Sequence, residues 1–427
     1  MIVTALILLL VFMALAIPVA ASLGVLGLAL EQIYSQLPLQ RAMGEVTWSA
    51  SNEFLLVSVP LFILLGEILL RSGFAERMYG ALIKWVSWLP GGLMHSNIAA
   101  CAIFAATSGS SVATAATVGT VALPQAKRFG YNERVFLGTL AAGGTLGILI
   151  PPSINMIIYA VLTNTSVPKL YLAGIVPGIV LTLLFMLTVI VLCAWRPAWG
   201  GQRMSATWRE RFASLQHLVP PLGIFLVVVG SIYAGIATPT EAASLGVVAS
   251  LGLAWWAGRL NFRMLKEAIE GTMRSTAMVM LIVLAAYFLN FVISAIGLTT
   301  LLTNFIEGLG WSPMMMLFAV VIFYVVLGCF METLSMMITT IPIIAPVMFK
   351  LGFDPIWFGI MIILLIETAL VTPPVGLNLF VVQNLRKSGS LNDVIIGTLP
   401  FVLALFVMLL VLAIFPQLAL WLPRAFA

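Results

Sequence analysis

Residues 147–155 read GILIPPSIN and residues 372–378 read TPPVGLN, so each half of the chain carries a double proline inside an apolar stretch. Two consecutive prolines remove two amide donors and clash with the preceding helical turn, which leaves the carbonyls before them without helical partners. At membrane depth, such backbone must be buried in protein or line a wet cavity. The two stretches therefore predict two broken membrane-spanning helices, over residues 134–165 and 355–385.

The composition of the whole chain places these breaks in a lipid bilayer. Of its 427 residues, 62% are apolar and only 8% are charged, and the mean hydropathy is +1.15. A typical soluble domain has about a quarter charged residues, so this chain could not cover a soluble surface. Its basic residues occur in short clusters between apolar runs rather than on one face, which excludes a nucleic-acid partner.

Long apolar runs separated by polar residues predict nine membrane crossings. These spans lie at residues 2–30, 54–70, 134–165, 171–195, 218–237, 242–257, 276–296, 355–385 and 391–416. Two further apolar stretches, residues 92–125 and 313–347, are interrupted near the middle by small or polar residues, at 107–111 and 331–333. Each predicts a re-entrant helical hairpin, so the expected fold is an all-α polytopic membrane protein.

The distribution of Lys and Arg predicts an orientation. With a cytoplasmic N-terminus and re-entrant hairpins, only four of the 20 basic residues face outward: Arg41, Lys169, Lys350 and Arg424. The other sixteen lie on the cytoplasmic side, which is a strong positive-inside bias. Counting each hairpin as a full crossing would destroy this partition, so the bias favours re-entrant hairpins.

The chain also matches itself at an offset of 222 residues. The run ASLGV recurs at this offset, and the two double prolines correspond at the same spacing. The offset covers an odd number of predicted crossings, so the copies have opposite orientations, as in the inverted repeats of secondary transporters. The first repeat is expected over residues 1–195 and the second over residues 239–427, with residues 196–238 as a linker that contributes one span.

Catalytic motifs are absent from the sequence. It contains no HExxH, no GxSxG and no Walker-type phosphate loop, and only two histidines occur. Its two aspartates, Asp354 and Asp393, lie outside the predicted spans, so an intramembrane aspartyl pair is excluded. The chain is therefore not expected to be an enzyme, and transport would draw its energy from an ion gradient or a partner.

Polar groups beside the breaks are the candidate binding groups. Carbonyls freed by the prolines, together with hydroxyls of a hairpin tip, can bind a dehydrated cation, and the N-termini of half-helices offer amides to an anion. The candidate substrate contacts are Ser111, Ser153, Asn155 and Asn378. Two alternatives stay open, because double prolines also kink membrane helices without binding a ligand, and small residues at a tip also serve close packing.

Three acids lie at membrane depth, where a carboxylate is costly and by default marks a functional site. Glu332 is the best candidate, because it occupies the second hairpin tip at the position that matches Ser110 in the first. Glu67 and Glu367 lie close to span ends, where either could reach water or an ion-pair partner. A fourth acid, Glu241, follows Thr238 at a spacing that is typical of a helix N-terminus.

Four stretches resemble the motifs of the large membrane subunit of TRAP (tripartite ATP-independent periplasmic) transporters, and the resemblance covers essentially the whole chain. They are TSGSSVATAATVG (107–119), GILIPPSIN, ATPTEAASLG (237–246) and TPPVGLN. The resemblance implies a scaffold domain and a mobile transport domain that holds both hairpins and both broken helices. It also implies elevator-type alternating access and coupling to sodium (Na+) in the bacterial inner membrane.

The resemblance assigns two sodium sites residue by residue. The first would use the residues Ser108, Ser110, Ser111, Gly147, Ile150 and Pro151. The second would use the residues Glu332, Thr333, Thr372, Pro373 and Gly376.

Two protein partners are also implied by the resemblance. One is a small membrane subunit, expected as a separate polypeptide because this chain begins directly with its first span; the other is a periplasmic binding protein that delivers a small organic acid anion. A stand-alone sodium-coupled carboxylate symporter is the nearest alternative. A non-transporting membrane scaffold or receptor is the alternative from another class, although a scaffold gains nothing from unwound backbone at the midplane.

Overall fold

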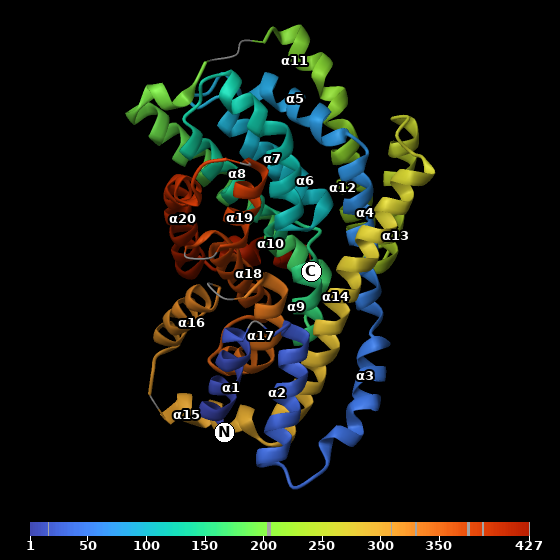
Figure 1. Ribbon diagram of the computed structural model, residues 1–427, viewed down its shortest axis with the longest axis vertical. Helices are drawn as coiled ribbons and strands as arrows, with labels where there is room; N and C mark the ends of the chain where they lie inside the picture. The colour runs from blue at the N-terminus through green and yellow to red at the C-terminus, as the bar shows by residue number, and fades with distance from the viewer. Residues whose placement is uncertain are drawn as a thin grey trace.

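The computed structural model describes residues 1–427 except Ala16, residues 203–205, Leu309, residues 329–330, residues 374–375, Lys387 and Ala427. Within that described part, every regular element is a helix (Figure 1). This agrees with the all-α membrane fold that the hydropathy predicts.

The helices of the first half are α1 (Ile2–Ala14), α2 (Val19–Tyr34), α3 (Met43–Ser51), α4 (Ser58–Arg71), α5 (Phe74–Val86), α6 (Leu93–Ser108), α7 (Ser111–Arg128), α8 (Glu133–Leu149), α9 (Ile154–Thr163) and α10 (Val167–Trp195). The next helices are α11 (Trp208–Ser214), α12 (Val219–Tyr233), α13 (Pro239–Trp256), α14 (Phe262–Ala295), α15 (Leu298–Gly308), α16 (Pro313–Leu327), α17 (Thr333–Lys350), α18 (Pro355–Val371), α19 (Leu377–Arg386), α20 (Leu391–Ile414) and α21 (Gln417–Ala425). Four short 3-10 turns lie at Leu39–Ala42, Phe54–Val57, Pro197–Gly200 and Leu215–His217.

Five helices of the described chain are long and apolar enough to cross a membrane unaided. They are Phe54–Arg71, Val167–Trp195, Phe262–Ala295, Thr333–Lys350 and Leu391–Ile414. The pair α8 and α9 passes the same test as one span bent by 42°, at the double proline where the sequence predicts a break. The length of α17 alone would let it cross, although it is one arm of the second hairpin.

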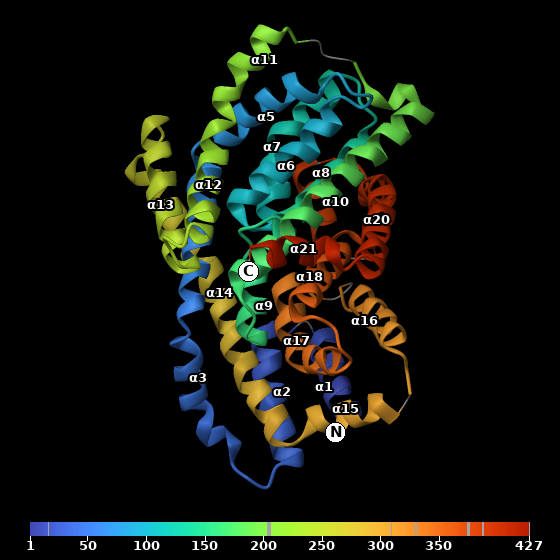
Figure 2. The same cartoon turned by 180° about the vertical axis from the view of Figure 1, so that it is seen from behind.

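The two hairpins enter the molecule from opposite ends. Helices α6 and α7 lie in the upper half beside α5, whereas α16 and α17 lie in the lower half above α15 (Figures 1 and 2). Gly73 precedes α5 and Gly297 precedes α15, and both have a left-handed φ of 73°, which glycine adopts without strain. The same sharp entry into a short helix is therefore built at both ends of the molecule.

The helices form two packed groups. In one group, α14 packs against α2, α3 and α4, and α13 packs against α4 and α12. In the other group, α8 is central and packs against α6, α7, α18 and α20. Contacts between the groups run mainly through α4 with α6, α12 with α6, and α14 with α17, so each hairpin reaches the first group.

The first predicted span, residues 2–30, is not one helix. The chain turns before Pro18, and α1 and α2 pack as an antiparallel pair in which the hydroxyls of Thr4 and Tyr34 lie 2.5 Å apart. Proline has no amide to continue the preceding helix, and here it starts the next one. This pairing places the N-terminus and residues 35–42 at the same end (Figure 1), so the prediction of a cytoplasmic N-terminus, which needed a single crossing, loses its basis.

Cysteines placed at Thr4 and Tyr34 should crosslink through a short bifunctional maleimide. In one continuous helix, these positions would lie roughly 45 Å apart, since each residue adds about 1.5 Å. Mass spectrometry of the digested protein detects the crosslinked peptides. The pair Thr4→Cys with Ser22→Cys, which the antiparallel arrangement separates, is the matched control. Equal crosslinking of both pairs, or of neither, would contradict the hairpin.

Candidate functional site

The tip of the first hairpin is built from residues with small polar side chains. Helix α6 ends at Ser108, and Gly109 reverses the chain with a left-handed φ of 59°. The Thr114 hydroxyl donates to the carbonyl of Ser110 at 2.7 Å, so the 2.9 Å contact between the Ser108 and Thr114 hydroxyls requires Ser108 to donate. A hydroxyl that donates keeps its lone pairs, so the Ser108 oxygen stays able to bind a cation.

This tip lies directly against the first double proline. A Cβ added to Gly147 would meet the carbonyl oxygen of Ser110 at 2.5 Å and the amide nitrogen of Ser111 at 2.9 Å. A Cβ added to Gly109 would meet the carbonyl oxygen of Pro152 at 3.0 Å. Tip and break therefore touch backbone to backbone, which only glycine allows at these positions.

The break itself frees polar backbone on both sides. Pro151 and Pro152 have no amide hydrogen, so the carbonyls of Gly147 and Ile148 lack the donor four residues on. After the break, the Ser153 hydroxyl caps α9 by accepting from the Met156 amide at 3.5 Å. The carbonyls at the end of α8 and the N-terminus of α9 thus meet within four residues.

Asn378 connects the second half of the chain to this tip. Its side-chain amide, at the start of α19, donates to the Ser111 hydroxyl at 2.7 Å and to the Ala141 carbonyl at 3.1 Å. Its carbonyl oxygen is buried and has no hydrogen-bond partner among the described residues. The side-chain nitrogen of Asn155, on α9, is also buried and also has no hydrogen-bond partner among the described residues. The first tip therefore lies between the break of one half and the broken helix of the other, with polar atoms left over.

The second predicted sodium site is described only in part, because residues 329–330 and 374–375 lie outside the described residues. Gly328 packs against Ala369, so the second hairpin contacts α18 near its end. The Thr372 hydroxyl donates to the Thr368 carbonyl at 2.6 Å, and Gly376 has a left-handed φ of 57°. Among the described residues, no hydrogen bond joins Glu332 or Thr333 to this break.

The three intramembrane acids have different environments. Glu332 caps α17, since its carboxylate accepts from the Ser335 amide at 2.8 Å, the Ser335 hydroxyl at 2.7 Å and the Leu334 amide at 3.2 Å. Glu67 forms an ion pair with Arg71. Glu367, on α18, is fully buried beside the backbone of Leu149, and neither carboxyl oxygen has a hydrogen-bond partner among the described residues.

Burial thus distinguishes Glu367 from the acid that the sequence favours. Sequence position could not show this, because Glu367 lies close to the end of an apolar run and only tertiary packing closes its access to water. The expected role of Glu241 is confirmed: with Thr238 it forms a reciprocal cap at the start of α13. The Ala141 carbonyl accepts a hydrogen bond from Asn378. The sequence could not predict this contact, because every residue has a backbone carbonyl.

Chemically, this arrangement suits binding and not catalysis. In the described part of the chain, no three His, Cys, Asp or Glu side chains gather where they could hold a metal ion. The site offers hydroxyl oxygens, backbone carbonyls and helix N-termini, all near the meeting point of a hairpin and a broken helix. Such paired elements define the class of membrane-embedded secondary transporters.

The comparisons with known proteins agree with this class. The family model of the tripartite ATP-independent periplasmic transporter, DctM component, matches residues 6–418. The C4-dicarboxylate TRAP transporter large permease protein of Pseudomonas aeruginosa is 34% identical to this chain, and the alignment covers 90% of each protein. The sialic acid TRAP transporter large permease protein of Vibrio cholerae is 31% identical, and the alignment covers 88% of this chain and 87% of that protein. The crystal structure of the Alcanivorax borkumensis YdaH transporter shares the fold, with a TM-score of 0.59 and 18% identity over 99% of this chain and 98% of that chain.

This chain belongs to the DctM family of TRAP transporter large permease subunits. It is accordingly a multi-pass inner-membrane permease of a secondary transporter and not an enzyme.

Proposed function

We propose that this permease imports a small organic acid anion together with sodium ions. It would work with a small membrane subunit and a periplasmic binding protein that delivers the anion. The observation that carries the proposal is the meeting of the first tip, the first break and Asn378, which gathers uncharged oxygens at one buried point. The names of the relatives, which include a C4-dicarboxylate and a sialic acid transporter, support a carboxylate as the transported group.

The cation part of the proposal follows from the chemistry of the oxygens. Hard cations bind hydroxyl, carbonyl and carboxylate oxygens in preference to nitrogen or sulfur. Ser108 and the freed carbonyl of Gly147 would supply neutral oxygens, and the unpartnered carboxyl of Glu367 lies close to the same break. An ionised carboxylate buried without a partner costs several kcal/mol, so a bound cation would stabilise this arrangement.

The anion part follows from the half-helices. Helix α9 begins at Ile154 and α19 begins at Leu377, and helix N-termini carry partial positive charge and free amides. No Lys or Arg occurs within residues 135–168 or 355–385, so the membrane-embedded breaks contain no cationic side chain to bind a carboxylate. A bound sodium ion would supply that positive charge, which makes anion binding depend on sodium.

The two packed groups support an elevator as the mode of movement. The group around α8 holds both hairpins and both broken helices, and the group around α14 would be the static scaffold. The short helices α5 and α15 lie at opposite ends, where they could brace the moving group in its two positions (Figure 2). The end with α5 and α11 is proposed to be cytoplasmic, because the basic clusters gather there.

Reconstitution in proteoliposomes tests the proposed function. The chain would be combined with its small membrane subunit and binding protein, and uptake of radiolabelled succinate and sialic acid would be measured under an inward sodium gradient. Uptake that needs the gradient and both partners supports the proposal. Uptake of free substrate by this chain alone would identify a stand-alone symporter, and no uptake of either probe under any gradient would favour a non-transporting scaffold.

Replacing Ser108 by alanine is expected to raise the sodium concentration for half-maximal uptake about tenfold. The reason is the loss of one oxygen that a charged ligand contacts, which is worth roughly 1.5–3 kcal/mol. Thr120→Val is the matched control, since the Thr120 hydroxyl donates within α7 to the Ala116 carbonyl and faces outward. An unchanged sodium dependence in Ser108→Ala would remove this residue from the site.

A further inference from the structure

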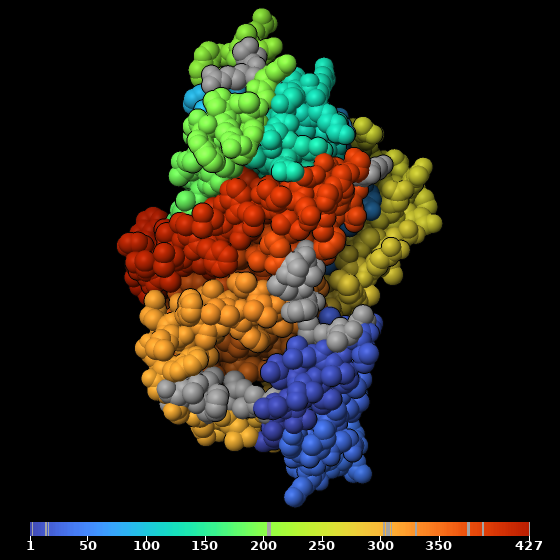
Figure 3. All heavy atoms as spheres, turned by 60° about the vertical axis from the view of Figure 1, so that its left-hand side comes forward, coloured from blue at the N-terminus to red at the C-terminus, as the bar shows by residue number. Residues whose placement is uncertain are grey.

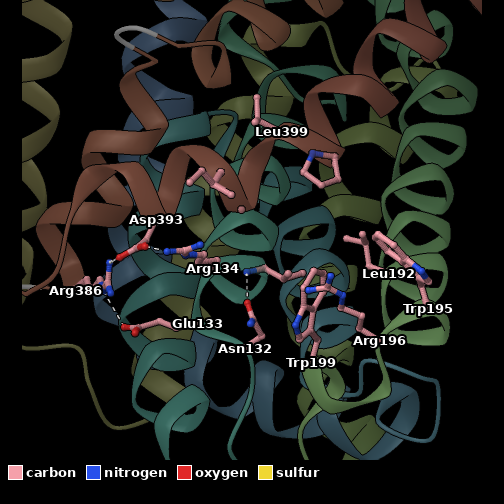
Figure 4. A pocket seen from close by; sticks show the side chains of 14 residues that line it. Asn132, Glu133, Arg134, Leu192, Trp195, Arg196, Trp199, Arg386, Asp393 and Leu399 are labelled. Atoms are coloured by element: carbon pink, nitrogen blue, oxygen red, sulfur yellow. Dashed lines mark hydrogen bonds and ion pairs between the residues drawn. The ribbon is translucent and has the colours of Figure 1, made fainter.

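A cavity of about 760 Å³ lies where α10 ends and α8 and α20 begin, away from the site described above. Two kinds of side chain meet in it: Arg134 and Arg386 with two acids on one side, and Arg196 with two tryptophans on the other (Figure 4). Trp195 is the last residue of a 29-residue span and Arg196 follows it directly, which puts the cavity at the membrane–water boundary, where tryptophan and arginine are enriched.

The acids of the cavity are already neutralised. Arg386 forms ion pairs with Glu133, at 2.8 Å from its Nε, and with Asp393, at 3.2 Å from its Nη1 (Figure 4). The Nε of Arg134 forms a second ion pair with Asp393 at 2.8 Å. The three arginines outnumber the two acids, and Arg196 has no carboxylate partner among the described residues. The N-termini of α8 and α20 add partial positive charge here, and together they outweigh the partial negative charge at the C-terminus of α10. The cavity therefore carries uncompensated positive charge.

Arg196 is held in place by aromatic and backbone contacts. Its guanidinium lies 5.1 Å from the ring centroid of Trp195 and 5.0 Å from that of Trp199. The Trp199 carbonyl accepts from the Asn132 amide at 3.2 Å, which fastens this turn to the loop before α8. Two cation–π contacts orient an exposed guanidinium without using its hydrogen-bond donors, so those donors stay available for an anion.

Apolar side chains continue from the cavity along both neighbouring helices. On α20, Ile396, Leu399 and Leu403 are exposed, and on α10 Val191 and Leu187 are exposed. The space-filling view shows α20, in red, lying along this face, with the green residues around the end of α10 above it (Figure 3). An occupant with an anionic head and an apolar tail fits both the charge and this surface.

We propose that the cavity binds the headgroup of one anionic phospholipid, with Arg196 and Arg134 at its phosphate and the acyl chains along the apolar faces of α10 and α20. Basic pockets between membrane helices are known sites for anionic lipid headgroups. The occupant would hold the start of α8, the helix that carries the first break at its other end. This inference rests on the membrane location of the chain and not on sodium coupling.

Native mass spectrometry of the purified, delipidated full chain tests the proposal. The protein is titrated with dioleoylphosphatidylglycerol or dioleoylphosphatidylcholine, and the affinity of the first bound lipid is measured. The wild-type chain should bind phosphatidylglycerol about tenfold more tightly than phosphatidylcholine. Arg196→Gln should lower the affinity for phosphatidylglycerol about fivefold, which is the effect of removing one arginine near a membrane surface. Arg209→Gln, an exposed arginine of α11 outside the cavity, is the control and should change nothing.

Two further measurements separate a lipid from a free anion. Leu399→Gln leaves the arginines intact but lowers the apolar contact, so it should weaken phosphatidylglycerol binding, and excess inorganic phosphate should not displace the lipid. A photoreactive phosphatidylglycerol should label the end of α10 and the start of α20. Equal binding by Arg196→Gln and Arg209→Gln, equal affinity for both lipids, full displacement by phosphate, or labelling elsewhere would overturn the proposal.

Discussion

Gly397→Val should leave almost no folded permease. A Cβ on Gly397 would overlap the carbonyl oxygen of Arg134, and a Cβ on Gly138 would overlap the carbonyl oxygen of Gly397. Helices α8 and α20 therefore cross backbone to backbone over one full turn, with no space between them. Small residues permit such close approach in membranes. Overpacking that neighbouring side chains can relieve costs about 1–3 kcal/mol, but the backbone of Arg134 cannot move aside, so a side chain at position 397 must force the two helices apart at a larger cost.

The measurement is thermal unfolding of the detergent-purified chain, followed by the monodisperse fraction in size-exclusion chromatography. Gly252→Val is the matched control, because a Cβ on this glycine of α13 meets no atom within 4 Å. The control should keep the wild-type melting temperature within a few degrees, whereas Gly397→Val should lose the monodisperse peak. Similar stability of the two variants would show that α8 and α20 do not cross in this way.

The hairpins and broken helices could be predicted from the sequence because glycine and proline act locally. Gly109 permits the left-handed φ that reverses the chain in the TSGSS stretch, and Pro151-Pro152 removes the amides that a continuous helix would need. A repeat whose offset covers an odd number of membrane crossings then requires opposite orientations of the two copies. These three facts need no knowledge of tertiary contacts.

The N-terminal hairpin could not be predicted in the same way. A single proline in a long apolar run, such as Pro18, is tolerated as a kink in many membrane helices. Whether the chain continues or folds back depends on packing between α1 and α2, including the contact of Thr4 with Tyr34. The hydropathy of residues 2–30 is the same in both cases.

Tertiary packing also decides how the site residues are used. The sequence places Glu332 at a hairpin tip, but its oxygens cap α17, while the fully buried Glu367 keeps unpartnered oxygens. The sequence places Gly397 in the predicted span 391–416 without showing that Gly397 touches α8. Local rules predict where a helix breaks, and only the assembled structure shows which groups meet at the break.

The meeting of tip and break makes Gly147 the most sensitive position of the proposed site. Its missing side chain lets α8 touch the backbone of Ser110 and Ser111, and backbone atoms cannot rotate away as a flexible side chain can. A methyl group there must push the tip away from the carbonyls that the double proline frees. Coordination of a cation by both elements at once requires distances that hold within a few tenths of an ångström.

Gly147→Ala should therefore raise the sodium concentration for half-maximal uptake at least tenfold, or abolish uptake, in proteoliposomes with matched protein content. Gly143→Ala, one turn earlier on α8, is the control, because the atoms nearest to its methyl group belong to the Cys101 side chain and the α6 backbone at Ile98, away from the tip. Both variants cost stability, about 1–3 kcal/mol each by overpacking. Only Gly147→Ala should change the sodium dependence. If both variants shift it equally, the effect is one of packing, and the tip and break do not share a cation.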